Sequence, residues 1–361
     1  MAQPTYGCGR QGMDSFDGFK GPRDDAIGPD VPLSPQERKA LERRVVVKGF
    51  TTEAVQEACD RAKKDGIPVV YLPEGRYVFN GVKIPGGLTL LGAGSKTLIS
   101  TVKDGMIFKV LGDKVRITRM KMYGGNPTPA HISESCCLQA YEVKNIRVDH
   151  CEVSAFARAI WFGRGAVAQV DHCIIHHNCW SGLGYGVISV GDGTRVLVCD
   201  NIFHSNRHTV TSNYGSPHYT FRHNHILDDK DCARRDNLSQ CDVHSEATEG
   251  TFVVEYNMFE NLKGAIGAWA GAFIVRGNLF RNVGYAIWIT SRRPHEIQDN
   301  NIFENVKHRY RGVVTGVCKG ERPITIPYMM EMDETGVIKV FEKDTTAYYT
   351  GSGKAPLGQI L

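Results

Sequence analysis

One short pattern recurs along the middle of the chain: a hydrophobic residue, two further residues, an asparagine, one residue and a second hydrophobic residue. Its asparagines are Asn201, Asn224, Asn257, Asn278 and Asn301, and two earlier copies carry Cys151 and Cys173 at the same place. Successive copies are 22, 28, 23, 33, 21 and 23 residues apart. A period of this size in β-rich segments is typical of a coil made of three short strands and three turns.

The repeated asparagines predict how the coils stack. Asparagine tolerates left-handed backbone geometry, so it can occupy a tight bend between two strands and hydrogen-bond to its copies above and below. Coils stacked about 4.8 Å apart bury a continuous core that no single coil could bury. We therefore expect the five asparagines to lie in one column at a bend.

A second strand precedes each marker by about a dozen residues. These strands are AIWF at 159–162, VISV at 187–190, TVTS at 209–212, DVHS at 242–245, AIGA at 265–268 and AIWI at 286–289. The alternation of side chains along a strand places alternate residues on opposite faces. It predicts that the inward residues include Ile160, Val210, Val243, Ile266 and Ile287. Their outward neighbours are then available for chemistry.

The segment before the coil carries a resemblance to a known group of proteins. Residues 51–66 have helical periodicity and end at a glycine, and the strand YLPEGRY at 71–77 and the run LLGAG at 90–94 follow. This start resembles the pectate-lyase-like superfamily, in which a short helix caps a right-handed parallel β-helix. The resemblance covers residues 50–309 and implies an all-β solenoid with three sheets. It specifies fold rather than chemistry, because the superfamily includes lyases, hydrolases, epimerases and phage tailspikes.

The chain divides into three regions on this interpretation. Residues 1–49 form an N-terminal arm, extended to residue 33, followed by a capped helix at 34–44. Residues 50–309 form the β-helix with its capping helix at 51–65. Residues 310–361 lack the repeat. We expect this tail to cover the far end of the coil or to join copies of the chain into a homo-oligomer.

Composition narrows the classes of partner. The formal net charge of +4 gives no argument for nucleic acid, and no run of 18 apolar residues predicts a membrane span. The N-terminus lacks the layout of a signal peptide, so for a secreted, extracellular location we expect either that a leader has been removed or that the protein leaves its cell another way. Eleven cysteines without a CxxC pair form neither a disulfide framework nor a metal-ligand pattern. We expect most of them to be free and packed in the core.

The richest polar clusters lie beside the two overlong repeats, and extra length in a solenoid goes into loops on one side. Asp242 and His244 flank the inward Val243 and should both point outward. Arg207 and His208 open the strand one coil earlier. We expect these four polar residues to be neighbours in one shallow groove.

This combination of residue types suits an acidic sugar. Arginine holds a carboxylate in a two-pronged contact, and histidine exchanges a proton near neutral pH. In β-elimination a neutralised uronate loses its C5 proton to a base while an acid assists the departing oxygen. Arg207, His208 and His244 could fill these roles, with Asp242 orienting a histidine.

A wider set of residues could bind substrate. It comprises Arg222, Tyr219, His218, Arg234, Arg235, Trp269, Trp288 and Arg293. Core packing competes with binding for Tyr219, because other repeats place apolar residues there. Other histidines, including His172, His176, His177, His204, His223 and His225, are expected to stack or to occupy turns. We predict no metal ligands in the groove, whereas the aspartates of the 228–240 loop leave a calcium cofactor open.

The sequence thus predicts a polysaccharide lyase that acts on a uronate-containing acidic polysaccharide. A glycoside hydrolase or a C5-epimerase on the same fold is the alternative enzyme. Asp242–Ser245 resembles the Asp-x-His motif of β-helical mannuronan C5-epimerases, but it lacks the proline and the second aspartate of that motif. A glycan-binding adhesin without catalysis is the alternative outside enzymes.

Overall fold

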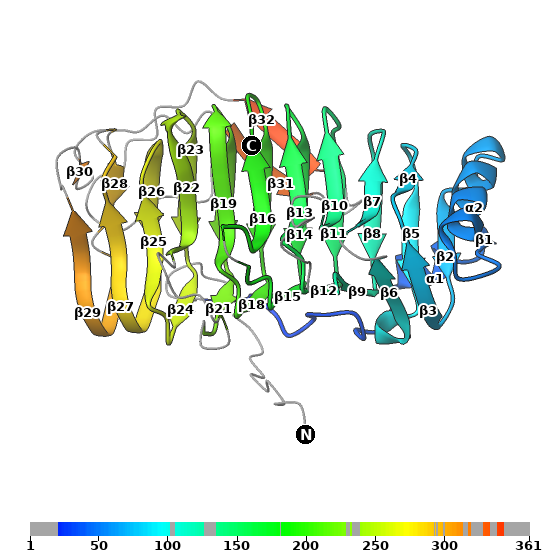
Figure 1. Cartoon of the computed structure of the whole chain (residues 1–361), viewed down its shortest axis with the longest axis horizontal. Coiled ribbons are helices and arrows are strands. Elements are labelled where there is room, and N and C mark those ends of the chain that lie inside the picture. The colour runs from blue at the N-terminus through cyan, green and yellow to red at the C-terminus, as the bar shows by residue number, and fades with distance from the viewer. Residues whose placement is uncertain are drawn as a thin grey trace.

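The computed structural model describes residues 21–101, 105–125, 135–180, 182–228, 232, 239–291, 293, 295–298, 300–312, 317–318, 328–332 and 338–342. Within them the chain winds into a right-handed parallel β-helix whose coils follow one another along the long axis (Figure 1). The fold predicted from the repeat is confirmed. The 22-residue period arises because each coil contributes one strand to each of three columns.

The first column is a parallel sheet. Its strands are β1 (Arg44–Val46), β2 (Val69–Leu72), β5 (Thr89–Gly92), β8 (Val115–Thr118), β11 (Ile146–Asp149), β14 (Val167–Asp171), β17 (Arg195–Cys199), β20 (His218–Arg222), β23 (Thr251–Glu255), β26 (Ala272–Arg276), β28 (His295–Ile297) and β30 (Val317–Cys318). We call it the first sheet.

The second column, the second sheet, consists of β4 (Val82–Ile84), β7 (Met106–Val110), β10 (Cys136–Tyr141), β13 (Arg158–Gly163), β16 (Tyr185–Val190), β19 (His208–Gly215), β22 (Ser239–Thr248) and β25 (Gly264–Ala268). The third sheet consists of β3 (Gly75–Phe79), β6 (Thr97–Thr101), β9 (Lys121–Tyr123), β12 (Glu152–Ser154), β15 (Ile174–His176), β18 (Ile202–His204), β21 (His225–Ile226) and β24 (Met258–Glu260). The long strands β27 (Leu279–Ile289) and β29 (Ile302–Gly312) pass through both columns.

The asparagine column is confirmed. The backbone N–H of Asn201 donates to Oδ1 of Asn224, and the same contact continues through Asn257 and Asn278 to Asn301, at 2.9–3.1 Å. All five are buried. The left-handed geometry that we expected of them falls instead on the residue before each of the first four, at Asp200, His223, Tyr256 and Gly277. The turn therefore combines a buried amide side chain with a left-handed residue directly before it.

The inward positions build one continuous apolar core. Ile160, Val187, Val210, Cys241, Ile266 and Ile287 occupy successive positions of the second sheet and are buried. The expected alignment of β22 was two residues off, because Val243 pairs with Ser212 rather than with Val210. A two-residue shift preserves the side-chain face, so Val243 is still inward and Asp242 still outward.

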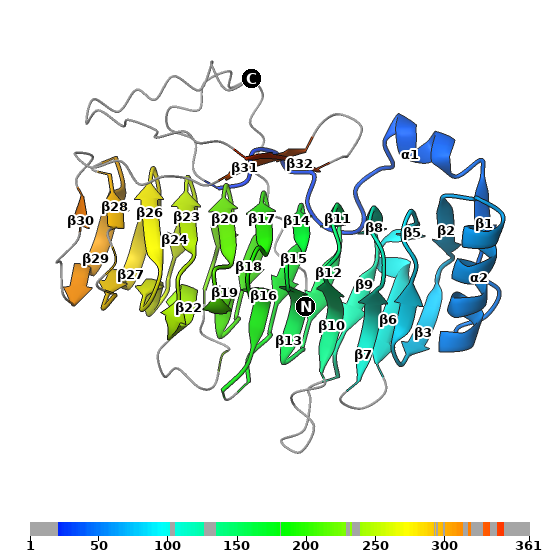
Figure 2. The same cartoon turned by 90° about the horizontal axis from the view of Figure 1, so that it is seen from above.

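Helix α2 (Thr52–Lys64) caps one end of the coil, as expected, with Val55, Cys59 and Ala62 facing the core. The shorter α1 (Pro35–Ala40) begins at a capping box formed by Ser34 and Glu37, and a 3₁₀ turn, η1 (Gly94–Lys96), follows β5. Figure 2 shows α1 and the preceding arm beside the ends of the first-sheet strands.

The described part of the arm, residues 21–33, crosses several coils. The backbone N–H of Gly21 donates to the Tyr256 carbonyl, and that of Gly28 donates to the His172 carbonyl. Arg23 pairs with the buried Asp200, and Arg119 donates to the carbonyl of Pro32. The arm therefore lies along the solenoid as a strap, by which we mean a segment that is bonded to several coils and ties them together.

One cysteine prediction needs correction. Cys179 and Cys232 form a disulfide that closes 53 residues, although their spacing suggested no bridge. Seven other described cysteines are free and buried, and two of them, Cys151 and Cys173, lie in the core as predicted.

The region after the coil is described only in part. It contains an antiparallel pair, β31 (Tyr328–Met332) and β32 (Ile338–Glu342). In the described part of the chain, no helix has the length and apolar character needed to cross a membrane.

Candidate functional site

The candidate site lies on the outward face of the second sheet, across β16, β19 and β22. Asp242 pairs with Thr211 of the preceding coil and with Gly267 of the next. The register changes beyond His244, where Gly215 pairs with Thr248, so β22 bulges there. Bulges of this kind re-aim side chains and often flank active sites.

Asp242 and His244 form the centre of the site. Oδ2 of Asp242 lies 3.0 Å from Nε2 of His244. The Asp242 side chain is 1% exposed, whereas that of His244 is 32% exposed. Only the imidazole is thus within easy reach of a ligand, with the carboxyl behind it.

His208 is more deeply placed than the sequence predicted. Its side chain is 2% exposed, and its Nδ1 donates to the Ser239 carbonyl at 2.6 Å, which leaves Nε2 without the proton in the neutral ring. It packs edge-on against His244, with ring centroids 5.1 Å apart. We expected His208 to line the groove; its side chain is instead buried and supports His244.

Several buried polar atoms of this cluster have close polar neighbours but form no well-aligned hydrogen bond among the described residues. They are Nε2 of His208, Nε2 of His244, Oγ1 of Thr211 and both carboxyl oxygens of Asp242. Buried polar groups are nearly always paired in native proteins, so each exception calls for an explanation. These poorly matched atoms mark the cluster as a candidate functional site.

Burial shifts the pKa values of the titratable side chains at the centre of the site. It raises the pKa of Asp242 to about 7, against smaller opposing effects of the Val243 backbone N–H, the Arg207 charge and the Trp269 indole. Burial, together with the Arg207 charge, lowers the pKa of His244 to about 4, and burial lowers that of His208 well below its usual range. At neutral pH the histidines are uncharged, and the Asp242 carboxyl is far easier to protonate than an ordinary aspartate.

The structure adds a residue that the sequence interpretation missed. Tyr185 occupies the position of His208 one coil earlier, and its ring centroid lies 5.6 Å from those of both His208 and His244. Arg207 Nη1 donates to the Tyr185 hydroxyl at 3.4 Å. Extending the predicted strand at 187–190 by two residues would have aligned Tyr185 with His208. Burial raises the pKa of Tyr185, so the phenol keeps its proton at neutral pH.

Aromatic rings continue the site on the other side. Trp269 and Trp288 are partly exposed, with ring centroids 4.7 Å apart, and Arg311 lies over the Trp288 ring at 3.8 Å. A Cβ at position 267 would come within 2.7 Å of the Trp269 Nε1 atom, so glycine makes room for this indole beside Asp242.

Arginine and aromatic rings also line the sheet before the site. Arg158 lies 4.5 Å from the Trp161 ring centre, and Arg164 lies 5.5 Å from that of Tyr141. The outward face of the second sheet therefore carries arginine–aromatic pairs on both sides of Asp242 and His244. We call these residues the arginine–aromatic strip: Tyr141, Arg158, Trp161, Arg164, Trp269, Trp288 and Arg311.

Other predicted binding residues are not brought to the site. Tyr219 is 0% exposed between Val196 and Phe252, which makes it a core residue. His218 and Arg222 lie on β20 of the first sheet, because the turn before it carries the chain away from the second. Arg293 is exposed and pairs with Glu249 at 2.6 Å. Arg234, Arg235 and most of the aspartates proposed for calcium lie outside the described residues.

The centre also has the composition of a cation site. His208, Asp242 and His244 offer one ligand atom each, all within 4.8 Å of one another. Imidazole nitrogens and a carboxylate are ordinary ligands of divalent transition metals. A chelator control is therefore part of any activity test.

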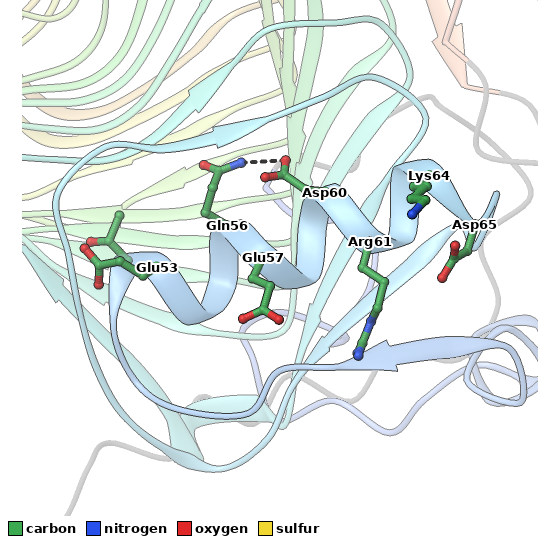
Figure 3. Close-up of a pocket in the computed structure, with 8 residues that line it drawn as sticks. Glu53, Gln56, Glu57, Asp60, Arg61, Lys64 and Asp65 are labelled. Carbon is green, nitrogen blue, oxygen red and sulfur yellow. Dashed lines mark hydrogen bonds between the residues drawn. The ribbon is translucent and has the colours of Figure 1, made fainter.

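The hollow drawn in Figure 3 is unrelated to this cluster. All of its lining residues come from α2 and its C-cap, and the view shows the Gln56–Asp60 hydrogen bond among side chains of both charges. We interpret it as the solvated outer surface of the cap.

The fold and this outward polar cluster define a right-handed parallel β-helix protein. Residues 113–318 match the family described as the right-handed β-helix region, and because this is more than half of the chain, the protein belongs to that family. No curated protein sequence matches it significantly.

Solved structures share the fold at low identity. The alginate lyase of Paenibacillus sp. FPU-7 is 16% identical, with a TM-score of 0.51 over 76% of this chain and 99% of that one. The DFA-IIIase of Arthrobacter chlorophenolicus A6 is 11% identical, with a TM-score of 0.53 over 77% and 93%. The Dettilon tailspike protein is 10% identical, with a TM-score of 0.50 over 86% and 78%.

Proposed function

We propose that the protein is a polysaccharide lyase that cleaves a uronate-containing glycan by β-elimination. The observation that carries the proposal is the Asp242–His244 pair: a carboxyl with a pKa of about 7, 3.0 Å from a partly exposed neutral imidazole. A proton-transfer group works best when its pKa is near the working pH. The pair can take up a proton as a unit.

The neighbours of the pair suit an acidic sugar. Arg207 would neutralise the uronate carboxylate and so acidify the C5 proton. His244, backed by Asp242, would accept that proton; the C4–C5 double bond forms as the C4–oxygen bond breaks. Tyr185, which keeps its phenolic proton at neutral pH, would protonate the departing oxygen. The proton on the His244–Asp242 pair then restores the phenol.

The surroundings support an extended anionic substrate. The arginine–aromatic strip offers flat rings for sugar faces and cations for carboxylates on both sides of the pair. We further propose that the protein acts outside the cell, because the Cys179–Cys232 disulfide is typical of oxidising compartments.

A product assay tests the reaction. Incubation with polyuronates should generate ultraviolet absorbance from the unsaturated uronate. Reducing ends without that absorbance would indicate a hydrolase, and inverted C5 centres in an uncut polymer would indicate an epimerase; either result overturns the lyase proposal. Added chelator separates a cation-dependent reaction from acid–base chemistry alone.

A binding assay tests whether the site prefers anionic glycans, as the proposal requires. Binding should favour anionic over neutral glycans and should weaken with salt, because the Arg207 contact is electrostatic. Arg207→Lys should lower activity, since a point charge cannot reproduce the two-pronged contact. Equal binding of neutral and acidic oligosaccharides at low and high salt would count against a uronate.

A further inference from the structure

A second histidine cluster lies on the third sheet, away from the strands that carry Asp242 and His244. His176 ends β15 and His204 ends β18, and the two are paired in register on adjacent coils. Their rings stack with centroids 4.6 Å apart and planes 6° from parallel. This stacking agrees with the role that the sequence predicted for them.

His177 turns the stack into a three-sided arrangement. Its backbone is left-handed, with φ of 52°, so its ring departs from the strand direction. That ring stands nearly perpendicular to both others, at 85° to His176 and 90° to His204. One ring nitrogen from each histidine falls within 4.8 Å of the other two. Stacking alone requires no such convergence.

The closest contact in the cluster joins two nitrogens of the same kind. Nδ1 of His176 lies 2.6 Å from Nδ1 of His177. A neutral imidazole has one donor nitrogen and one acceptor nitrogen, so two facing nitrogens either share a proton or direct lone pairs at a common cation.

The outer partner of His176 favours the cation. Its Nε2 lies 3.1 Å from Oε1 of Glu152, which is held in turn by Lys121 at 2.5 Å. With Nε2–H donating to this carboxylate, the Nδ1 lone pair of His176 is exposed to the cluster. Metal-binding histidines almost always donate their other N–H to a carboxylate or carbonyl in this way.

We propose that His176, His177 and His204 bind a divalent transition-metal ion of the zinc class, with Glu152 orienting His176. Three imidazoles suit zinc, nickel or copper rather than calcium or magnesium, which prefer oxygen ligands. Tetrahedral ligands about 2.1 Å from zinc lie about 3.4 Å apart, so binding the ion requires the two Nδ1 atoms to move apart from 2.6 Å. The ion would tie β15 to β18.

The experiment uses untagged full-length protein, freed of metal by a chelator and titrated with Zn²⁺ by calorimetry. The wild type should bind Zn²⁺ at this site. His177→Asn, which tolerates the left-handed backbone, and His204→Gln should each weaken binding about tenfold or more. Glu152→Gln should weaken it less, through the lost orientation of His176.

Two controls give the result its meaning. His225→Ala, at the third-sheet histidine that pairs with Glu260, and His244→Ala, at the candidate active site, should leave this binding unchanged. Circular dichroism is the check that each variant is folded. Wild-type protein that binds no Zn²⁺, or binding that His177→Asn and His204→Gln leave intact, overturns the proposal and leaves the cluster a hydrogen-bonded stack.

Discussion

Oδ2 of Asp242 lies 3.0 Å from Nε2 of His244, although the two side chains leave the same strand two residues apart. The carboxyl is buried and the imidazole partly exposed, so a proton can pass between solvent-side ligand and protein interior through one contact. This relationship is the basis of the first two predictions.

Asp242→Asn and His244→Ala should each lower turnover of the polyuronate by about a hundredfold or more, because general acid–base groups contribute at least that much. Initial rates of unsaturated product measure the effect. His225→Ala is the matched control, since His225 also pairs with a carboxylate, Glu260, but on the third sheet. Variants that are folded and fully active would contradict the assignment.

Stability should depend on pH through Asp242. Its folded pKa of about 7 lies above the ordinary value of 3.8, so its contribution is fully present below pH 3.8 and is lost as the pH rises through about 7. The Asp242→Asn variant has no carboxyl to ionise, so it does not lose stability over this pH range. Urea unfolding at about pH 5 and about pH 8 should therefore show the variant gaining on the wild type as pH rises. A constant difference between the two proteins would mean an unshifted pKa.

The asparagine column should be costly to interrupt. Asn257 accepts hydrogen bonds from the backbone and side-chain amides of Asn224 and donates to the carbonyl of Phe221. Asn257→Ala leaves these buried groups unpaired and should reduce the free energy of unfolding by about 3 kcal/mol. Denaturant titration measures this loss.

A surface asparagine gives the comparison. The Asn282 side chain donates to Oδ1 of Asn261 at an exposed position of β27, and its backbone is left-handed. Asn282→Gly retains that backbone and should cost less than about 1 kcal/mol. Equal losses at Asn257 and Asn282 would show that the buried column contributes nothing special.

The arm should act as a strap through Arg23. Its Nε and Nη2 atoms donate to the buried Asp200 carboxylate at 2.9 and 2.5 Å. Arg23→Ala leaves that charge underpaired and should destabilise the protein by about 1–2 kcal/mol, less than for a fully buried pair because Arg23 is 43% exposed. It should also speed proteolysis of the arm. Lys96→Ala, which removes an exposed pair with Glu74, should cost less than about 1 kcal/mol; similar losses would contradict the strap.

The sequence was sufficient for the coil, because the requirements of each turn are local and recur. Every copy of the pattern from Asn201 onward has a buried amide at the same bend, and the position of the repeat predicts the resulting Asn224–Asn257 contact. The prediction of left-handed geometry at the asparagine itself was wrong, because the residue before the asparagine adopts that geometry instead.

The outward placement of Asp242 was also predictable, since strand faces alternate and survive the two-residue misalignment of β22. Its depth was not. Tyr185, Trp269 and His208 surround the pair from other coils, and their bulk decides that the carboxyl is buried and its pKa raised.

Only the tertiary structure decided which polar residues share a face. His218 and Arg222 follow His208 closely in sequence but lie on another sheet, because an intervening turn redirects the chain. Cys179 meets Cys232 across 53 residues, and Arg23 meets Asp200 across 177. A repeating sequence determines how one coil stacks on the next, whereas these contacts depend on where loops and the arm lie against the finished solenoid.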